Sequence, residues 1–270
     1  MKVYNVDTWD GVKDAFRLIE EERISLAQKD TLARSSSKTL FRGHSNAEWD
    51  IQTTLERVRK EPVLITDYYR HMLLTLPQVE AFSNTRWELI SYDECCAWAA
   101  QRYDLYWPDY PGYEYMIYLR HHGFPSPLLD WSSSPYVAAF FAYSNISEKS
   151  ESIAIFAYAE GGIKSWNNSI PLITVKGPYV RSHKRHFLQQ CQYTVCSKFT
   201  SRGLEYGSHE EVFSLDRETP DRLWKIVAPR SSASHALEDL DTMNVNALSL
   251  IGSEDALIQT LGAREYFFNP

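Results

Sequence analysis

The segment Tyr136 to Tyr143, YVAAFFAY, restricts the fold more than any other part of the chain. Pro135 precedes it, and proline is favoured in the first turn of a helix, so we predict that a helix begins here. Its residues are apolar on nearly every side, whereas a surface helix keeps one polar face. The chain must therefore place other elements around this helix.

The remaining pattern mixes strands and helices without regular alternation. β-rich apolar runs predict strands over residues 3–6, 39–43, 152–159, 172–175 and 223–228. Helical spacing predicts helices over residues 9–24, 53–57, 65–76, 92–102, 113–121, 136–143, 234–243 and 246–261, the last of them broken at Ser253-Glu254. Because the two types do not alternate, we expect an α+β fold rather than a doubly wound sheet.

The chain of 270 residues carries a formal net charge of −7. This charge opposes a non-specific nucleic-acid coat but leaves room for a local basic groove around Arg181 to Arg185. The four cysteines, Cys95, Cys96, Cys191 and Cys196, lack the spacing of a zinc site, so we expect free thiols and no metal. The first residues lack an apolar signal core and no run is long enough to span a bilayer. We therefore expect a cytoplasmic protein without a membrane partner.

The tripeptide Phe41-Arg42-Gly43 is the first candidate for chemistry. Arginine offers a planar fork of donors that suits phosphate or carboxylate. Gly43 allows either a close backbone approach or a positive φ. A surface arginine in a salt bridge at the end of a strand is the simpler interpretation, and the tripeptide alone favours it.

The second candidate is the stretch HGFPSPLLDWSSSP, in which a rigid proline pair precedes Asp130 and three serines. Asp130 follows two core leucines, so its carboxylate needs a partner. Ser133 or Ser134 is placed to cap the following helix, although free N–H groups at that helix start could instead hold a phosphate. His121 or His122 is a candidate general base near neutral pH.

The third candidate contains Arg185 and Gln189, which are four residues apart and can share one helical face. The amides of Gln189 and Gln190 suit ribose hydroxyls. A solvated end of an amphipathic helix explains this stretch equally simply.

Taken together, the three stretches resemble the FRG domain family. Phe41 to Gly43 match the Phe/Tyr-Arg-Gly motif that names the family, and His122 to Pro135 match its long His-Gly-x-Pro motif. Ala138 to Ala142 match its Ala-x-x-Phe-Ala helix. Arg185 to Tyr193 match its Arg-x-x-x-Gln-x-Gly-x-Phe element, except that cysteine replaces the glycine and tyrosine the phenylalanine.

The resemblance covers roughly residues 40–261, and it implies an N-terminal strand–helix extension over 1–38 and an FRG domain with C-terminal helices over 39–270. The order of the motifs is similar to that of an ADP-ribosyltransferase fold. We therefore expect a single domain whose split, mostly antiparallel β core is surrounded by helices and forms a cleft for NAD.

The same resemblance implies roles for individual residues. As catalytic residues it implies Arg42, His122, Asp130 and Gln189. For NAD binding it implies Phe41, Arg42, Gly43, Trp131, Ser132, Ser133, Phe140, Tyr143 and Arg185, with Phe141 as an alternative to Phe140 and Tyr143 for the aromatic ring. The role that glutamate usually fills in that fold stays open among Asp130, Gln189, Gln192, Glu210 and Glu211.

The function implied is an NAD-dependent ADP-ribosyltransferase, acting as a toxin or effector in a bacterial toxin–antitoxin or phage-defence system. An antitoxin protein is then an expected partner and RNA an expected acceptor. Two alternatives stay open: a nuclease toxin that uses His121 or His122 with Arg42, and a non-catalytic module that senses a nucleotide.

Overall fold

The computed structural model describes residues 1–29, 38–101, 110–145, 149–161, 170–177, 184–214 and 221–268. The strands in these ranges are β1 (Lys2–Asn5), β2 (Leu40–His44), β3 (Leu128–Ser132), β4 (Ser152–Ala159), β5 (Leu172–Lys176), β6 (Cys191–Thr200), β7 (Gly203–Tyr206) and β8 (Arg222–Pro229). The helices are α1 (Trp9–Lys29), α2 (Thr54–Val58), α3 (Ile65–Ser83), α4 (Tyr92–Ala100), α5 (Tyr113–His121), α6 (Pro135–Tyr143), α7 (Lys184–Leu188), α8 (His209–Ser214), α9 (Ala233–Thr242), α10 (Ala247–Ile251) and α11 (Glu254–Tyr266).

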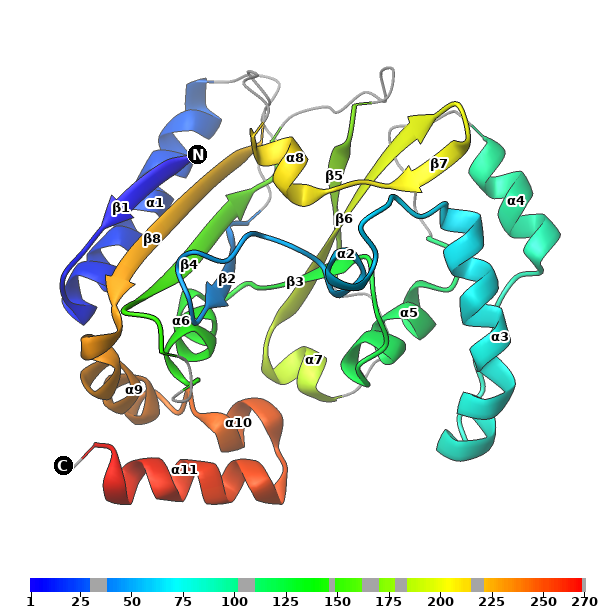
Figure 1. Cartoon of the computed structure of the whole chain (residues 1–270). Helices are drawn as coiled ribbons and strands as arrows, with labels where there is room; N and C mark the ends of the chain where they lie inside the picture. The colour runs from blue at the N-terminus through cyan, green and yellow to red at the C-terminus, as the bar shows by residue number, and fades with distance from the viewer. Residues whose placement is uncertain are drawn as a thin grey trace.

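All eight of these strands belong to one sheet, with the order β1-β8-β4-β2-β3-β6-β5 and with β7 paired to β6 (Figure 1). β1 and β8 run parallel, and every other described strand pair is antiparallel. The expectation of a mostly antiparallel core mixed with helices is confirmed.

The sheet is nearly divided between β2 and β3. These two strands share a single paired position, Phe41 opposite Ser132, whereas β2 pairs with β4, and β3 with β6, over five positions each. Beyond Phe41 the two strands therefore diverge, and side chains rather than backbone bonds fill the space between them. The sheet thus consists of two halves joined at one point.

Alternation along the strands separates the two faces of the sheet. In β4, Ile153, Ile155 and Ala157 belong to the core that packs under α1, α6 and α9, whereas Phe156 and Tyr158 belong to a core on the opposite face. On the face that carries α6, a further cluster packs α3 and α5 against β3 and β6. Two separate cores therefore share one face, and they meet near β2 and β3.

Figure 1 shows how the helices follow this division. α3, α4 and α5 gather beside the β6–β7 end, and α1, α6 and α9 to α11 gather beside the β1–β8–β4 end. α6 is enclosed, as its apolar sequence predicts, because six of its nine residues are buried.

The first 29 residues are built into this architecture. β1 extends the sheet as an edge strand on β8, and Trp9, Val12 and Ile19 of α1 are fully buried in the core under α6.

Three strands were not predicted as such. Leu128 to Ser132 lies between prolines and was not assigned to a strand, yet it forms β3, which is paired with β6 on one side and with β2 at one position on the other. β6 and β7 form an antiparallel hairpin with Gly203 at its turn. Propensity did not identify these strands because their long-range pairing, rather than local pattern, stabilises them.

Candidate functional site

A pocket of about 280 Å³ opens where the two cores meet, beside the single β2–β3 bridge. It is lined by Phe41, Arg42, Gly43, Asp130, Trp131, Ser132, Val137, Ala138, Phe141, Gln189 and Cys191. We call it the Arg42 pocket. The lining residues come from all three sequence stretches that carried candidate chemistry, although these are up to about 150 residues apart in the chain.

Gly43 explains how α6 comes to form one wall of this pocket. A Cβ at this position would overlap the carbonyl oxygen of Ala138 and would lie 2.7 Å from the amide nitrogen of Ala142. The strand and the helix thus touch backbone to backbone, which only glycine permits. Of the two reasons that the sequence offered for this glycine, close approach is therefore the one that applies.

Arg42 bridges the two halves of the sheet where their pairing ends. Its Nε donates to Nε2 of His44 at 3.0 Å, and its Nη1 donates to the backbone oxygen of Asp130 at 2.7 Å. Among the described residues, no acceptor lies within hydrogen-bond distance of its Nη2. Burial lowers the pKa of Arg42 to about 10, so the guanidinium stays charged at neutral pH. Arg42 therefore brings a fixed positive charge to the pocket and keeps part of its fork available.

Two buried histidines lie near this charge. Burial, together with the charge of Arg42, lowers the pKa of both His44 and His209 to about 3. Both rings are therefore neutral at pH 7, which allows Nε2 of His44 to accept the hydrogen bond from Arg42. His209 lies 2.9 Å from the hydroxyl of Thr194, which accepts a hydrogen bond from the indole of Trp131.

Asp130 is held by Arg120, a residue that the sequence analysis did not select. The guanidinium of Arg120 donates from Nε and Nη2 to the two carboxylate oxygens of Asp130. Its Nη1 donates to Oγ1 of Thr54 at 3.0 Å, and the amide of Ser126 donates to the same oxygen. Burial opposes ionisation of Asp130, but the charge and hydrogen bonds of Arg120 outweigh it and lower the pKa of the carboxyl. Asp130 is therefore an oriented carboxylate, with 35% of its side chain exposed.

Arg120 could have been found from two signals in the sequence. A carboxylate at the edge of a core requires a partner, and Arg120 lies in the last turn of a predicted helix ten residues before Asp130. The spacing alone could not select it over His121 or His122, because the turn between α5 and β3 decides which side chain points back.

The serine loop after β3 connects the second and third stretches. Ser132 donates its hydroxyl to the backbone oxygen of Gln189 at 2.8 Å and accepts a hydrogen bond from the amide of Ser134. The amide of Ser133 donates to the backbone oxygen of Gln190 at 3.0 Å, and the hydroxyl of Ser134 caps α6. The amides of Ser133, Ser134 and Val137 are therefore already used within the protein.

Gln189 and Cys191 line the pocket from the segment between α7 and the start of β6. The side-chain amide of Gln189 donates to the backbone oxygen of Leu250 in α10 at 3.1 Å, and its Oε1 lies 3.7 Å from Sγ of Cys191. Burial, with the nearby charge of Asp130, raises the pKa of the Cys191 thiol to about 12, so the sulfur stays protonated. Both groups shape the pocket, and neither is a free acid or base.

The aromatic side chain that α6 presents to the pocket is Phe141. The other two candidates, Phe140 and Tyr143, lie elsewhere: Phe140 lines a different cavity, and Tyr143 is buried against Trp9 with its hydroxyl 3.0 Å from that of Ser232. Because α6 is apolar on all sides, its pattern could not show which face meets the pocket.

Other candidate residues also lie outside the pocket lining. His122 is exposed, stacks on Tyr118, and has Nδ1 2.8 Å from the backbone oxygen of Tyr118. Ser133, Arg185, Gln192, Glu210 and Glu211 do not line the pocket either. Of the basic run Arg181 to Arg185, the residues Arg181 to His183 lie outside the described residues.

The described residues contain neither a cluster of metal-binding side chains nor a helix that could cross a membrane. No group of three or more histidine, cysteine, aspartate or glutamate side chains in these ranges is placed to hold a metal ion. None of the described helices has both the length and the apolar composition that crossing a membrane requires.

The fold and the site together define a mixed α/β protein with a mostly antiparallel sheet and an arginine–carboxylate pocket where its two halves join. In a comparison with protein families, residues 37–151 match the model of the FRG domain. The match includes Arg42, Arg120, Asp130 and Phe141, and ends before Gln189. No curated protein and no solved structure matches the chain.

Proposed function

We propose that the Arg42 pocket binds NAD and that the protein is an NAD-dependent ADP-ribosyltransferase. One observation carries the proposal: the three separate sequence stretches meet in a single pocket at the junction of a divided, mostly antiparallel sheet. The volume of about 280 Å³ is near the lower end of small-molecule pockets, which suits one end of a dinucleotide rather than all of it.

In the proposed reaction, the bond between C1′ of the ribose and the nicotinamide nitrogen breaks, and nicotinamide leaves as a neutral molecule. A bond from C1′ to the acceptor forms, and the acceptor releases its proton to solvent. Positive charge develops on the ribose as the first bond breaks, so a fixed carboxylate nearby lowers the barrier.

The side chains of the Arg42 pocket suit two tasks in this reaction, positioning the dinucleotide and stabilising the charge that develops on the ribose. Arg42 offers the remaining donors of its fork to the pyrophosphate and so positions the dinucleotide. Asp130 faces the developing positive charge, and Arg120 keeps its carboxylate ionised and oriented. Phe141, with 38% of its residue surface exposed, offers a ring on which nicotinamide can stack.

A second candidate is a module that binds the nucleotide without turnover. Asp130 is the one acidic residue among the described residues that line the pocket, and both of its oxygens accept hydrogen bonds from Arg120. An occupied carboxylate is a poor base for activating an acceptor. Nothing comparable favours the nuclease alternative, since neither His121 nor His122 lines the pocket.

The test measures binding and chemistry separately. NAD affinity is measured by titration calorimetry and nicotinamide release by chromatography. Transfer is measured as the labelled ADP-ribose that appears in the RNA, DNA and protein fractions of a bacterial lysate. We expect binding, release and transfer, with RNA as the acceptor of a toxin or phage-defence effector. Binding without release would assign the sensing module, and a protein that does not bind NAD would end both candidates.

Matched variants connect the result to the pocket. Phe141→Ala removes an exposed ring from the lining, and we expect at least about a fivefold loss of NAD affinity, because stacking on aromatic rings contributes about 1–3 kcal/mol per base. Phe187→Ala is the control, since this ring on α7 is 58% exposed and does not line the pocket. Equal losses of NAD affinity in the two variants would show that NAD binds outside the Arg42 pocket.

A further inference from the structure

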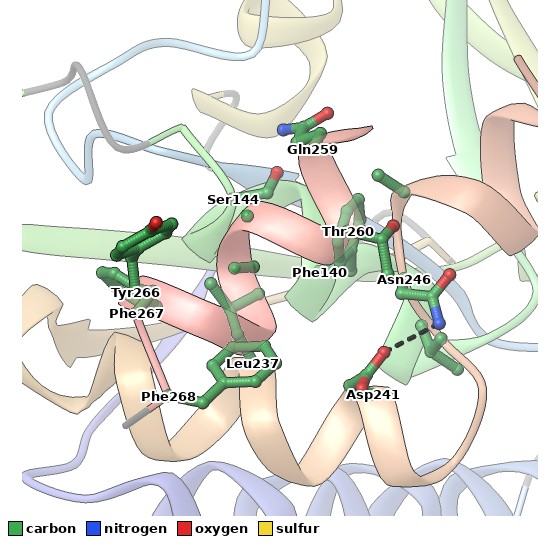
Figure 2. A pocket seen from close by; sticks show the side chains of 14 residues that line it. Phe140, Ser144, Leu237, Asp241, Asn246, Gln259, Thr260, Tyr266, Phe267 and Phe268 are labelled. Atoms are coloured by element: carbon green, nitrogen blue, oxygen red, sulfur yellow. Dashed lines mark hydrogen bonds between the residues drawn. The ribbon is translucent and has the colours of Figure 1, made fainter. Parts of the chain in front are cut away.

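A second cavity, also of about 280 Å³, lies among the helices α6, α9, α10 and α11 (Figure 2). Phe140 enters it from α6, Leu237 from α9, and Phe267 and Phe268 from the end of α11. We call it the C-terminal pocket. Its lining is mostly apolar, and it shares no residue with the Arg42 pocket.

Asp241, the one charged residue among the described residues of this lining, is already paired, and so are the side chains of Asn246 and Thr260. The side-chain amide of Asn246 donates to Asp241 at 2.8 Å, as Figure 2 shows, and Arg264 donates to both oxygens of the same carboxylate. The hydroxyl of Thr260 donates to the backbone oxygen of Ala256 and accepts from the amide of Leu248. A ligand here would meet no charge in need of a partner, so a charged molecule would lose its hydration without compensation.

Three uncharged hydrogen-bonding groups are available. The hydroxyls of Ser144 and Tyr266 and the side-chain amide of Gln259 line the pocket, and none of them has a hydrogen bond to another described residue. The cavity is larger than the apolar cavities of about 150 Å³ that take up benzene. These features match a neutral ligand with an aromatic or aliphatic body of up to about two rings and one uncharged donor or acceptor.

Two elements connect this pocket to the Arg42 pocket. On α6, Phe140 lines the C-terminal pocket and its neighbour Phe141 lines the Arg42 pocket. On α10, Ala247 lines the C-terminal pocket, and the backbone oxygen of Leu250 accepts the side-chain hydrogen bond of Gln189. A ligand that fixes α6 and α10 therefore acts on two walls of the Arg42 pocket.

We propose that the C-terminal pocket binds a neutral, mostly apolar small molecule, and that its occupancy stabilises the wall of the Arg42 pocket that contains Gln189. This inference does not depend on NAD being the ligand of the Arg42 pocket. It is therefore tested without NAD, so that failure of either proposal leaves the other intact.

The probe is 1-naphthylamine, a neutral two-ring aromatic molecule with one amine group, whose fluorescence shifts to shorter wavelength in apolar surroundings. We expect saturable binding with one site per chain. Ala263→Phe fills the cavity from α11, and we expect it to weaken binding at least about tenfold without unfolding the protein. Ala100→Phe, at the exposed end of α4, is the control and should bind like the unchanged protein.

Hydrogen–deuterium exchange tests the connection between the two pockets. With the probe bound, we expect slower exchange over residues 184–192, which contain Gln189 but do not line the C-terminal pocket. Non-saturable fluorescence, or equal binding by Ala263→Phe, would overturn the binding site. Unchanged exchange over 184–192 in the saturated protein would overturn the connection.

Discussion

The two pockets have the same volume, about 280 Å³ each, but they are built in opposite ways. The Arg42 pocket lies where strand pairing fails, and Arg42, Arg120 and Asp130 hold its charged groups in one arrangement. The C-terminal pocket lies among helix side chains, and its one acidic residue, Asp241, is neutralised within the protein. The difference separates a site that can position a charged ligand from a site that selects against charge.

Each pocket has a glycine, an ion pair and a phenylalanine from α6. At the Arg42 pocket these are Gly43, the Arg120–Asp130 pair and Phe141. At the C-terminal pocket they are Gly262, the Arg264–Asp241 pair and Phe140. The same substitution can therefore be made in both, and unequal effects would show that the contrast between the two sites is real.

The glycines should give the largest difference. In Gly43→Ala the new methyl group meets the backbone of α6, which cannot move without disturbing the core, so we expect a loss of more than about 3 kcal/mol of stability. In Gly262→Ala, no atom lies within 4 Å of the new Cβ, and α11 should gain about 0.5–1 kcal/mol from better helix propensity. Urea unfolding of both variants provides the measurement. A Gly43→Ala protein as stable as the parent would mean that α6 does not touch β2.

The second-largest difference in stability is expected between the ion pairs of the two pockets. Removing Arg120 leaves the carboxylate of Asp130 without its partner in a largely buried site. Because 35% of the Asp130 side chain is exposed, we expect a coupling of about 2–3 kcal/mol, below the value for a fully buried pair. The measurement is a double-mutant cycle that combines Arg120→Ala with Asp130→Ala.

The control cycle uses Arg264 and Asp241 of the C-terminal pocket. The side chain of Arg264 is 46% exposed, so solvent screens its interaction and we expect a much smaller coupling. Equal couplings in the two cycles would contradict the view that the Arg42 pocket has a rigid charged framework.

The sequence predicts local elements well and long-range pairing poorly. Tyr113 to His121 and Ser152 to Ala159 form the predicted helix and strand, because spacing and β-rich composition act locally. β3 was missed because a strand flanked by prolines is recognised only once β2 and β6 lie beside it. The predicted helix over 65–76 ends before Pro77, whereas α3 continues through this proline, because tertiary packing overrides its low helix propensity.

For the candidate site, too, the sequence predicts some features and not others. Motif order indicates that Arg42, Asp130 and Gln189 belong together, and all three line one pocket. It does not give orientation: Phe141 rather than Phe140 faces the pocket, and Arg120 rather than a histidine contacts Asp130. Which side chain faces a cavity depends on the rotation of α6 and on the turn after α5, and neither is encoded in an apolar pattern.

The smallest expected effect concerns pH and again separates the pockets. His44 and His209 lie near Arg42, whereas the described lining of the C-terminal pocket contains no histidine. Both histidines are neutral in the folded protein, with a pKa of about 3, because burial and then the charge of Arg42 oppose protonation. Arg57 and Lys225 add to this effect at His44.

The unfolded chain protonates these histidines near their ordinary pKa of 6.5, so it binds more protons than the folded protein at lower pH. Their contribution to stability is therefore complete above about pH 6.5 and is lost as the pH falls toward 3. Each histidine should lower the free energy of unfolding by about 1.4 kcal/mol between pH 7.5 and 5.5. His44→Asn and His209→Asn should each remove one such contribution from urea unfolding measured at the two pH values. A pH dependence that neither substitution reduces would show that these rings do not lie buried beside Arg42, and the Arg42 pocket would then lack the charged, dehydrated framework that distinguishes it from the C-terminal pocket.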